Sequence, residues 1–410
     1  MEVAANQSAV SSRLQEVFSS ISKPERWDYF NIEVDTASKK NRFLSEFYVG
    51  KLVNKDTGED TYIVIKIVPA DGLITSYEEI YRNEINFFSN IFPELNKFQR
   101  NKKVQSLFAN IPNYLGGHLS NNKQFLVMEN VSAAGYKLYE TQDCFPSDFL
   151  KTIFKVYARF HALSFAYKHE YPDGFYNLTK DLVDVVEILN KEGLCMSMEH
   201  TYNAAVDVFN PETDADIIKR LTAIGDVKEK YFNLRFYNGN YECLLHGNCF
   251  IPNILVKTET WEEKEKYDVM LLNFQFAYVG TPVFDLCHFF YSSAPKADLD
   301  RLYDYLKYYH RCFSIFLKEL GGNPNVIYPL EVLEREWKEY SLLGIVTGLC
   351  ARVKTCMDKK EFEEFCQKSY LPKEKIMEFW TVKANEVYKQ PKFKESAKHL
   401  CLHAVEFGLI

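Results

Sequence analysis

The amino-acid sequence predicts an α+β protein with two lobes, a small β-rich lobe followed by a larger, mainly helical lobe. Short β-rich segments occupy the chain between about residues 27 and 68, whereas helical periodicity dominates after about residue 131. A length of 410 residues is ample for two lobes and a large core. We therefore assign residues 1–25 to an N-terminal helical extension, 26–130 to the small lobe and 131–410 to the large lobe.

The small lobe has the pattern of a sheet with one helix packed on it. Residues 8–22, which precede it, have an amphipathic helical pattern. Three β-rich segments follow, and the polar stretch Asn54–Asp60 between the last two is typical of a hairpin turn. Residues 76–92 have helical periodicity, and two further strands are expected around 112–119 and 124–130. The predicted order is therefore β-β-β-α-β-β.

Helices dominate the large lobe, which has one β-rich insertion. A long helix is predicted to begin at Pro146, and helical segments continue to about residue 236. The β insertion occupies residues 241–274, and its polar stretch 258–266 has the composition of a hairpin tip. Helices then run from about residue 296 to the end of the sequence. The junction between two lobes of this kind is a natural place for a ligand.

Aromatic residues are unusually frequent, with 32 Phe and 27 Tyr. The favoured interpretation is that they fill the core of the helical lobe, and the alternative is that some line a pocket for a large apolar ligand. In the predicted helix Arg301–Phe313, the residues Leu302, Tyr305, Tyr309 and Phe313 fall on one face, as core packing requires.

Composition excludes several classes of function. A net charge of -7 argues against nucleic acid or an anionic membrane surface as partner. No apolar run approaches the ~20 residues that a membrane span requires, and the N-terminus lacks the pattern of a secretory signal. The ten cysteines include no CxxC pair, which argues against a zinc site or a redox motif. Reduced thiols and a cytoplasmic location are therefore expected.

Five motifs occur in a fixed order along the chain. They are VIKIV around Lys66 with a following helix that carries Glu84, FLVMENVSAAGY, ARFHALSFA, HGNCFIPN and LLNFQFAYVGTPVFDLCHFF. Together, over about residues 25–390, they resemble the ecdysteroid kinase-like (CHK-type) family of the aminoglycoside phosphotransferase and choline kinase superfamily. The resemblance implies a protein-kinase-like two-lobed fold, ATP and magnesium as cofactors, and a small-molecule ligand such as a hydroxylated apolar compound.

The resemblance also implies roles for residues of the small lobe. Phosphoryl transfer depends on positioning and charge neutralisation more than on covalent chemistry. By this resemblance Lys66 grips the α- and β-phosphates, and Glu84 on the next helix holds Lys66 in place. The alternative for this pair is a structural salt bridge that meets no nucleotide. Backbone groups of Glu129, Asn130 and Val131 would contact the adenine ring.

Further matched positions belong to the large lobe. Asn253 matches an asparagine that ligates magnesium, and Asp285 matches an aspartate that braces the catalytic loop, a structural role. His246 belongs to the catalytic-loop motif, two residues before the position of the catalytic base. We interpret His246 and His161 as hydrogen-bonded structural histidines rather than general bases.

Three departures from the family pattern affect the chemistry. The base position holds Asn248, and the main metal-binding position holds Asn273. An amide cannot accept a proton near pH 7 and is a poorer ligand than a carboxylate for a hard dication. Loss of a general base typically lowers a rate by ~10²–10⁴. The loop expected within residues 36–50 has no glycine before Gly50 to cover phosphates and carries cations instead: Lys39, Lys40 and Arg42.

Two hypotheses of different class follow. The first is a catalytically impaired member of the family, a pseudokinase that binds a small molecule or a protein partner. The second is an active ATP-dependent kinase that phosphorylates a hydroxyl of an ecdysteroid or similar apolar substrate through an altered metal arrangement. The three departures favour the first. Other chemistries have no support, because the motifs GxSxG, HExxH and GxxxxGK[ST] are absent.

Overall fold

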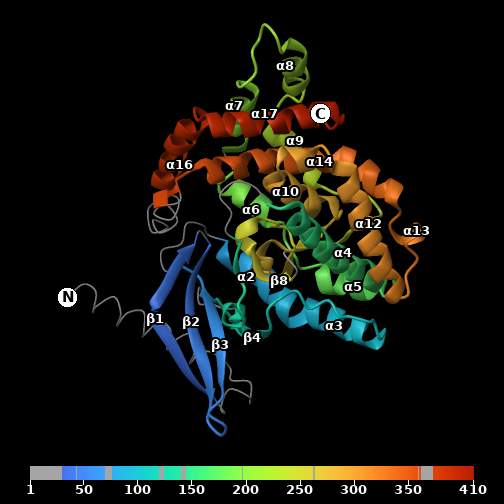
Figure 1. Ribbon diagram of the computed structural model, residues 1–410. Coiled ribbons are helices and arrows are strands. Elements are labelled where there is room, and N and C mark those ends of the chain that lie inside the picture. Colours follow the sequence, from blue (N-terminus) through green and yellow to red (C-terminus); the bar gives the residue numbers. More distant parts are fainter. Residues whose placement is uncertain are drawn as a thin grey trace, which may run out of the picture.

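The structure, a computed structural model, places a sheet beside a larger helical lobe (Figure 1). It describes residues 30–42, 44–69, 76–119, 124–139, 145–195, 197–261, 264–358, 360–361 and 373–410. The helix predicted at residues 8–22 and the assigned extension 1–25 lie outside these residues. The boundary between the lobes at residue 130 stays a prediction.

The small lobe contains a five-stranded antiparallel sheet within the described residues, with the strand order β1-β2-β3-β5-β4. The strands are β1 (Phe30–Arg42), β2 (Ser45–Asn54), β3 (Asp60–Ile67), β4 (Tyr114–His118) and β5 (Phe125–Glu129). On β3, Ile63, Ile65 and Ile67 are buried in a cluster with residues of β2 and β5. Because side chains alternate along a strand, the intervening Lys66 points to the opposite face.

Strand β1 corrects one expectation. We expected a loop within residues 36–50, but β1 continues to Arg42 and pairs with β2 as far as Ser45. A register shift between Asp35 and Lys40 interrupts the pairing. β1 lies at the edge of the sheet, where a strand need not bury one of its faces. Its polar residues therefore lack the alternation of apolar and polar side chains that predicts a strand.

A continuous helical segment follows the first three strands. It consists of α2 (Tyr77–Asn86), a π-helical turn (Phe87–Ile91) and α3 (Phe92–Asn101). The sequence pattern predicted an end near residue 92. The helix continues past that point, and the π-helical turn, in which the N–H of Phe92 bonds to the carbonyl oxygen of Phe87, lies directly before Pro93. The predicted order β-β-β-α-β-β is confirmed.

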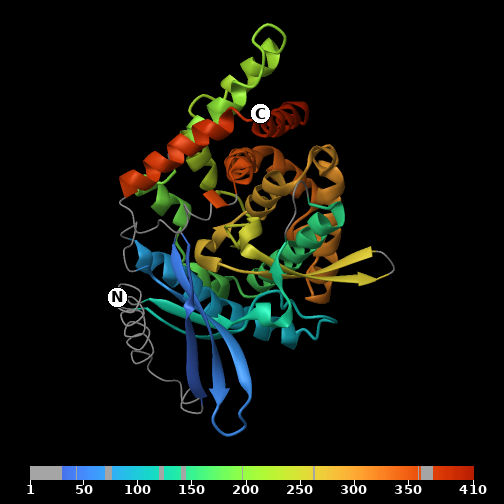
Figure 2. The same cartoon turned by 60° about the vertical axis from the view of Figure 1, so that its left-hand side comes forward.

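Helices form most of the large lobe, and Figure 2 shows them above strands β1 to β3, which are blue. They are α4 (Ser147–Glu170), α5 (Pro172–Thr179), α6 (Val185–Lys191), α7 (Ser197–Val206), α8 (Ala215–Thr222), α9 (Val227–Arg235), α10 (Val283–Ser293), α11 (Lys296–Leu299), α12 (Leu302–Glu319), α13 (Pro324–Ile327), α14 (Leu330–Cys356), α16 (Lys373–Tyr388) and α17 (Pro391–Glu406). In the described residues, no helix is both long and apolar enough to cross a membrane. The α+β two-lobed class is confirmed.

Small residues let two central helices approach closely. A Cβ atom on Gly344 of α14 would lie 2.5 Å from the carbonyl oxygen of Cys287 on α10. A Cβ atom on Gly348, one turn further on, would lie 2.5 Å from the carbonyl oxygen of Tyr291. The two glycines therefore allow α10, which carries Asp285, to pack directly on α14.

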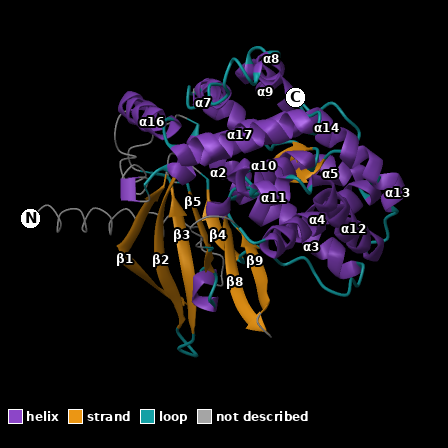
Figure 3. Cartoon of the chain, turned by 45° about the horizontal axis from the view of Figure 1, so that its top comes forward, coloured by secondary structure: helices purple, strands orange, loops and turns teal. Residues whose placement is uncertain are grey.

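The β segments of the large lobe differ in part from the predicted insertion. Strands β8 (Ile254–Trp261) and β9 (Lys264–Leu271) form the expected hairpin, and they include most of the stretch that we expected to be its tip. Short strand β6 (Lys137–Leu138) adds to β8. Strand β7 (Cys243–Leu245) pairs instead with β10 (Tyr278–Gly280), outside the predicted insertion. Figure 2 shows the hairpin of β8 and β9, in yellow, projecting from the large lobe, and Figure 3 labels both strands.

Aromatic residues fill the core of the large lobe. The four residues of the predicted face of α12, namely Leu302, Tyr305, Tyr309 and Phe313, are each at most 1% exposed. Tyr309 donates or accepts a hydrogen bond at 2.9 Å to Nδ1 of His161 on α4, so the two helices also share a polar contact. Core packing is therefore the correct interpretation of this face.

Candidate functional site

A buried ion pair joins the sheet to the helix packed on it. The ammonium of Lys66 on β3 lies 2.5 Å from Oε2 of Glu84 on α2, and neither side chain is exposed. The rings of Phe47 and Tyr81 lie 5.7 and 5.9 Å from the ammonium. A buried charge of either sign would be costly alone, so each side chain depends on the other. The two residues that the sequence predicted as partners are thus brought together.

Three asparagines extend from this ion pair into the large lobe. The ammonium of Lys66 donates to Oδ1 of Asn273 at 3.0 Å. Nδ2 of Asn273 donates to Oδ1 of Asn253 at 2.6 Å, and Nδ2 of Asn253 donates to the carbonyl oxygen of Asn248 at 3.0 Å. We call these three hydrogen bonds, the last of which is accepted by a backbone carbonyl, the amide row.

The amide row has a fixed direction. An ammonium has only donors, so the group of Asn273 that faces Lys66 must be its oxygen. The nitrogen of Asn273 then faces Asn253, whose oxygen must accept, and the nitrogen of Asn253 faces a carbonyl oxygen. Turning either amide over would place two acceptors or two donors against each other. The network itself therefore assigns the orientation of both amides.

The backbone at Asn273 positions its side chain at the junction of the lobes. Asn273 follows β9 and precedes a turn of 3-10 helix, Phe274–Phe276, with φ 64° and ψ 61°. Asparagine tolerates this left-handed conformation better than most residues other than glycine. The chain therefore turns sharply at Asn273 and sends Phe274 into the core.

A buried carboxylate braces the loop that contains Asn248. Oδ2 of Asp285 on α10 accepts from the backbone N–H of His246 at 2.7 Å, and Oδ1 accepts from that of Gly247 at 2.8 Å. Oδ2 also lies 3.1 Å from Nε2 of His161. Burial alone raises the pKa of Asp285, but the hydrogen bond and charge of His161 reverse this effect and lower it overall. Asp285 thus lies against the loop, and its structural role stays a prediction.

His246 is held between the same loop and the strand before Asn273. Its Nε2 lies 2.8 Å from the carbonyl oxygen of Leu272, and burial lowers its pKa. At Gly247, φ is 77° and a Cβ atom would lie 1.9 Å from the carbonyl oxygen of Phe276, so only glycine fits. His246 thus links the loop to the segment of Asn273 and has the contacts of a structural histidine.

Aromatic rings form a second connection between the lobes. We name Tyr114, Phe88, Phe87, Phe274 and His246 the aromatic stack. The rings of Phe88 and Tyr114 lie 6.1 Å apart, Phe87 stacks on Phe274 at 3.7 Å, and Phe274 meets His246 edge-on at 4.7 Å. Phe87 and Phe88 come from the π-helical turn after α2. Sequence reasoning missed this stack, although the two adjacent phenylalanines after Glu84 were a visible signal.

The segment Glu129–Val131 connects the lobes at the end of β5. The N–H of Glu129 donates to the carbonyl oxygen of Asn113, and that of Asn130 donates to the carbonyl oxygen of Tyr62. Oδ1 of Asn130 accepts from the N–H of Ser132 and caps the following 3-10 turn. The N–H of Val131 is the first of that turn and has no acceptor within it. The contact of these backbone groups with an adenine ring stays a prediction.

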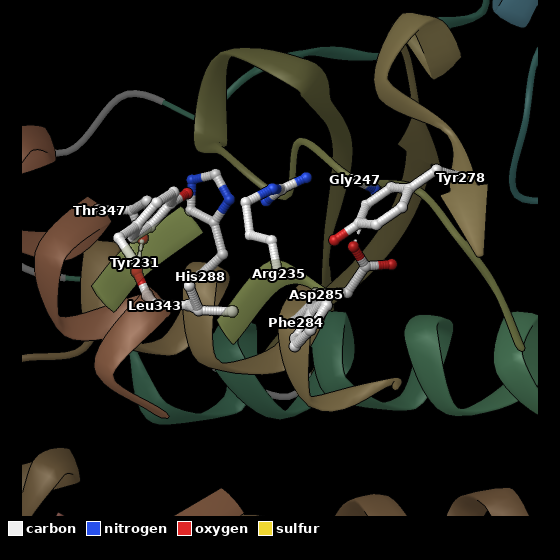
Figure 4. A pocket seen from close by; sticks show the side chains of 9 residues that line it. All are labelled: Tyr231, Arg235, Gly247, Tyr278, Phe284, Asp285, His288, Leu343 and Thr347. Atoms are coloured by element: carbon white, nitrogen blue, oxygen red, sulfur yellow. Dashed lines mark hydrogen bonds between the residues drawn. The ribbon is translucent and has the colours of Figure 1, made fainter. Parts of the chain in front are cut away.

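A small cavity lies behind the loop, and sequence reasoning missed it (Figure 4). It has room for about one water molecule. Arg235 of α9 lies between His288 and Tyr278 in this view and binds both oxygens of Asp184, at 2.7 and 2.6 Å. The buried hydroxyl of Tyr278 has no hydrogen-bond partner among the described residues. Burial lowers the pKa of His288 to about 4.

The donor groups present do not fit the magnesium that the resemblance implies. Magnesium favours carboxylate and water oxygens in an octahedral arrangement. The two matched positions hold amides, Asn253 and Asn273, and the oxygen of Asn273 already accepts from Lys66. Among the residues that the structure describes, no group of three or more His, Cys, Asp or Glu side chains could hold a metal ion.

A family model matches this chain over more than half of its length. The model of the ecdysteroid kinase-like family matches residues 42–322, a range that contains every candidate site residue. A search of curated proteins found no match. A crystal structure described as that of a kinase domain matches with 14% sequence identity and a TM-score of 0.24, over 93% of this chain and 95% of that chain.

Proposed function

This chain belongs to the ecdysteroid kinase-like family, and from that premise we propose that it is a catalytically impaired member, a pseudokinase that binds a small molecule. The kinase-like fold is the established part of this statement. The loss of efficient phosphoryl transfer and the nature of the ligand are the proposal.

The single observation that carries the proposal is the environment of Asn273. Its oxygen accepts from Lys66 and its nitrogen donates to Asn253, so both polar atoms of the side chain have protein partners. Residues at this position and at 253 hold magnesium in the family pattern, and a neutral amide pair that bonds to itself has little to offer a hard cation. Efficient phosphoryl transfer relies on metal ions that neutralise the developing charge.

The base position supports the same conclusion. Asn248 has an amide where the family has a carboxylate, and an amide cannot take the proton of a substrate hydroxyl near pH 7. A missing general base lowers a rate by ~10²–10⁴. Neither His246 nor His161 compensates, because His246 is held by Leu272 and His161 by Asp285 and Tyr309.

The fit of ATP differs between its two ends. The backbone of Glu129–Val131 would hold the adenine, with the N–H of Val131 as donor. Lys66 would meet the phosphates, but its ammonium is fully buried against Glu84 and Asn273. We therefore propose weak nucleotide binding with little dependence on magnesium. We propose a hydroxylated apolar compound as the small-molecule ligand, as the family name suggests, and a cytoplasmic location; a protein partner is the other candidate.

One observation favours the alternative, an active ATP-dependent kinase for such a hydroxylated compound. The ion pair between Lys66 and Glu84 is formed, and kinases require this pair for activity. A loose transition state can also tolerate the loss of a base better than the loss of positioning. In this case a metal would have to be held at the phosphates without a carboxylate ligand at residue 273.

A thermal-shift titration with ATP separates the two functions. It is carried out with chelator, with magnesium and with manganese, and turnover of ATP is followed in parallel with a hydroxylated steroid. The pseudokinase predicts a small rise in Tm that is the same in all three conditions, and no turnover at an ordinary kinase rate. Magnesium-dependent stabilisation by several degrees, or steroid-dependent turnover, would show that the protein is an active kinase.

A further inference from the structure

We propose that the carboxamide of Asn273 takes the place of a divalent cation, holding the sheet of the small lobe to the loop of the large lobe without any metal. Asn273 is thus a positioning residue that keeps Lys66 buried and the junction of the lobes closed. The inference rests on the proposed function in treating this junction as the ligand site. It does not require that phosphoryl transfer be lost.

The first argument is that the amide nitrogen of Asn273 faces the oxygen of Asn253. A carboxylate at residue 273 would put an oxygen there instead, and a cation would be needed between the two oxygens. The amide row joins Lys66 on β3 to Asn253, which ends the loop before β8. Oδ1 of Asn253 is an acceptor, and the atom of Asn273 that faces it at 2.6 Å is a donor nitrogen. A carboxylate at residue 273 would place an anionic oxygen against this acceptor.

Asn253 cannot relieve such a contact by turning over. Its nitrogen donates to the carbonyl oxygen of Asn248, and a turned amide would place its oxygen against that carbonyl. The repulsion would therefore remain, either between residues 273 and 253 or between residues 253 and 248. A divalent cation between the two oxygens is the simplest relief, whereas the amide nitrogen of Asn273 avoids the conflict altogether.

The second argument is the burial of Lys66. Its side chain is 0% exposed, with Glu84 on one side and Asn273 on the other. A phosphate can reach the ammonium only after one of these partners moves. The amide row therefore closes the junction, because protein groups already occupy the ammonium that would bind phosphate.

The third argument is that the neighbouring contacts brace the same segment. Phe274, directly after Asn273, stacks on Phe87 and meets His246. The carbonyl oxygen of Leu272, directly before Asn273, lies against Nε2 of His246. The backbone N–H of Leu272 donates to the carbonyl oxygen of Asn253 at 2.8 Å. Asn273 is thus fixed on both sides, so its side chain has a defined place between Lys66 and Asn253.

The test compares the Tm of three variants in chelator and in millimolar magnesium at matched ionic strength, without nucleotide. Wild type should have the same Tm in both conditions. Asn273→Asp should have a Tm lower by about 2–5 °C in chelator and should recover most of this loss in magnesium. Asn273→Gly accepts the left-handed backbone, so it should fold, lose a similar amount and recover nothing.

Asn90→Asp is the matched control. Nδ2 of Asn90 also donates to an asparagine oxygen, that of Asn86 at 2.8 Å, but Asn90 is exposed on the helical segment. Its Tm should be close to that of wild type and independent of magnesium. A merely structural role for Asn273 would lower the Tm of Asn273→Asp equally in both conditions.

Two results would overturn the inference: an Asn273→Asp variant whose Tm does not respond to magnesium, or a wild-type protein that magnesium alone stabilises. These results are distinct from a failure of the proposed function. Turnover of ATP by wild type would contradict the pseudokinase and leave the metal response of Asn273→Asp intact. The absence of that response would leave the pseudokinase unaffected.

Discussion

Nζ of Lys66 and Oε2 of Glu84 lie 2.5 Å apart, and neither side chain has any exposed surface. Oε1 of Glu84 is buried without a hydrogen-bond partner among the described residues. The carboxylate therefore depends on a single cation. Removing that cation leaves a buried charge unpaired, which costs more than the pair contributed.

We expect Lys66→Met to lower the free energy of unfolding by about 3–5 kcal/mol, because Glu84 and the oxygen of Asn273 both lose their donor. Urea denaturation at neutral pH measures the loss. The double variant Lys66→Met with Glu84→Met should regain much of it, since an apolar pair of similar volume replaces a buried ion pair at little cost. If the double variant is as unstable as the sum of the single variants, the carboxylate is not the source of the loss.

Restoring both carboxylates should restore ATP binding more readily than phosphoryl transfer. In the variant Asn248→Asp with Asn273→Asp, we expect ATP binding that depends on magnesium, measured by isothermal titration with and without the metal. Phosphoryl transfer should stay slow, because the sequence at 38–46 still lacks glycine to approach the phosphates. Asn248→Asp alone is the control and should bind ATP as wild type does. Full kinase activity in the double variant would contradict the importance of the missing glycines.

Asp285 should control the order of the loop that carries Asn248. The two carboxylate oxygens of Asp285 accept from three donors, which belong to His246, Gly247 and His161. Asp285→Asn keeps only one acceptor oxygen. We expect a loss of about 2–3 kcal/mol in the free energy of unfolding, as for a charge-assisted hydrogen bond. Hydrogen exchange of the His246 and Gly247 amides should accelerate by more than exchange in α12. Equal acceleration everywhere would indicate global destabilisation only.

His288 should give the protein a measurable sensitivity to acid. Burial lowers its pKa to about 4 in the folded state, against about 6.5 in an unfolded chain. The folded state therefore favours the neutral ring, and its stabilising contribution is complete above pH 6.5 and declines as pH falls to about 4. The whole contribution amounts to about 3 kcal/mol.

His288→Gln should flatten this part of the pH profile. Between pH 7 and pH 4.5, the free energy of unfolding should fall more for wild type than for the variant. Urea denaturation measures both. His403, whose pKa burial also lowers to about 4, stays in both proteins and serves as an internal reference. Parallel pH profiles would mean that the His288 ring is solvated or protonated in the folded state.

The order of the motifs predicted which residues meet, but not how they bind one another. Local patterns located the strand of Lys66 and the helix of Glu84, and the family resemblance implied that the two side chains meet. The direction of the amide row was not predictable, because it depends on the left-handed backbone of Asn273 and on which atom of each amide faces its neighbour. Those features arise only when distant segments are packed together.

Short and edge strands were the other source of difference. β7 and β10 have three residues each and are separated in the sequence by residues 246–277, and such short runs have no distinctive alternation. The residues lining the cavity behind the loop come from α9, α10 and α14 as well as from the loop. Sequence separation therefore hides the relation of Arg235 to Tyr278, although they lie in direct contact, the guanidinium 4.8 Å from the ring.

The hydrogen bond between Lys66 and Asn273 joins residues that are 207 positions apart in the sequence. We expect a contact between such distant residues to form late in folding, because the segments between them must be ordered first. Changes at Asn273 should therefore leave the refolding rate nearly unchanged and speed unfolding in proportion to the stability lost. The amide row would then determine how long a folded molecule survives before it opens, rather than how quickly a new chain reaches its structure.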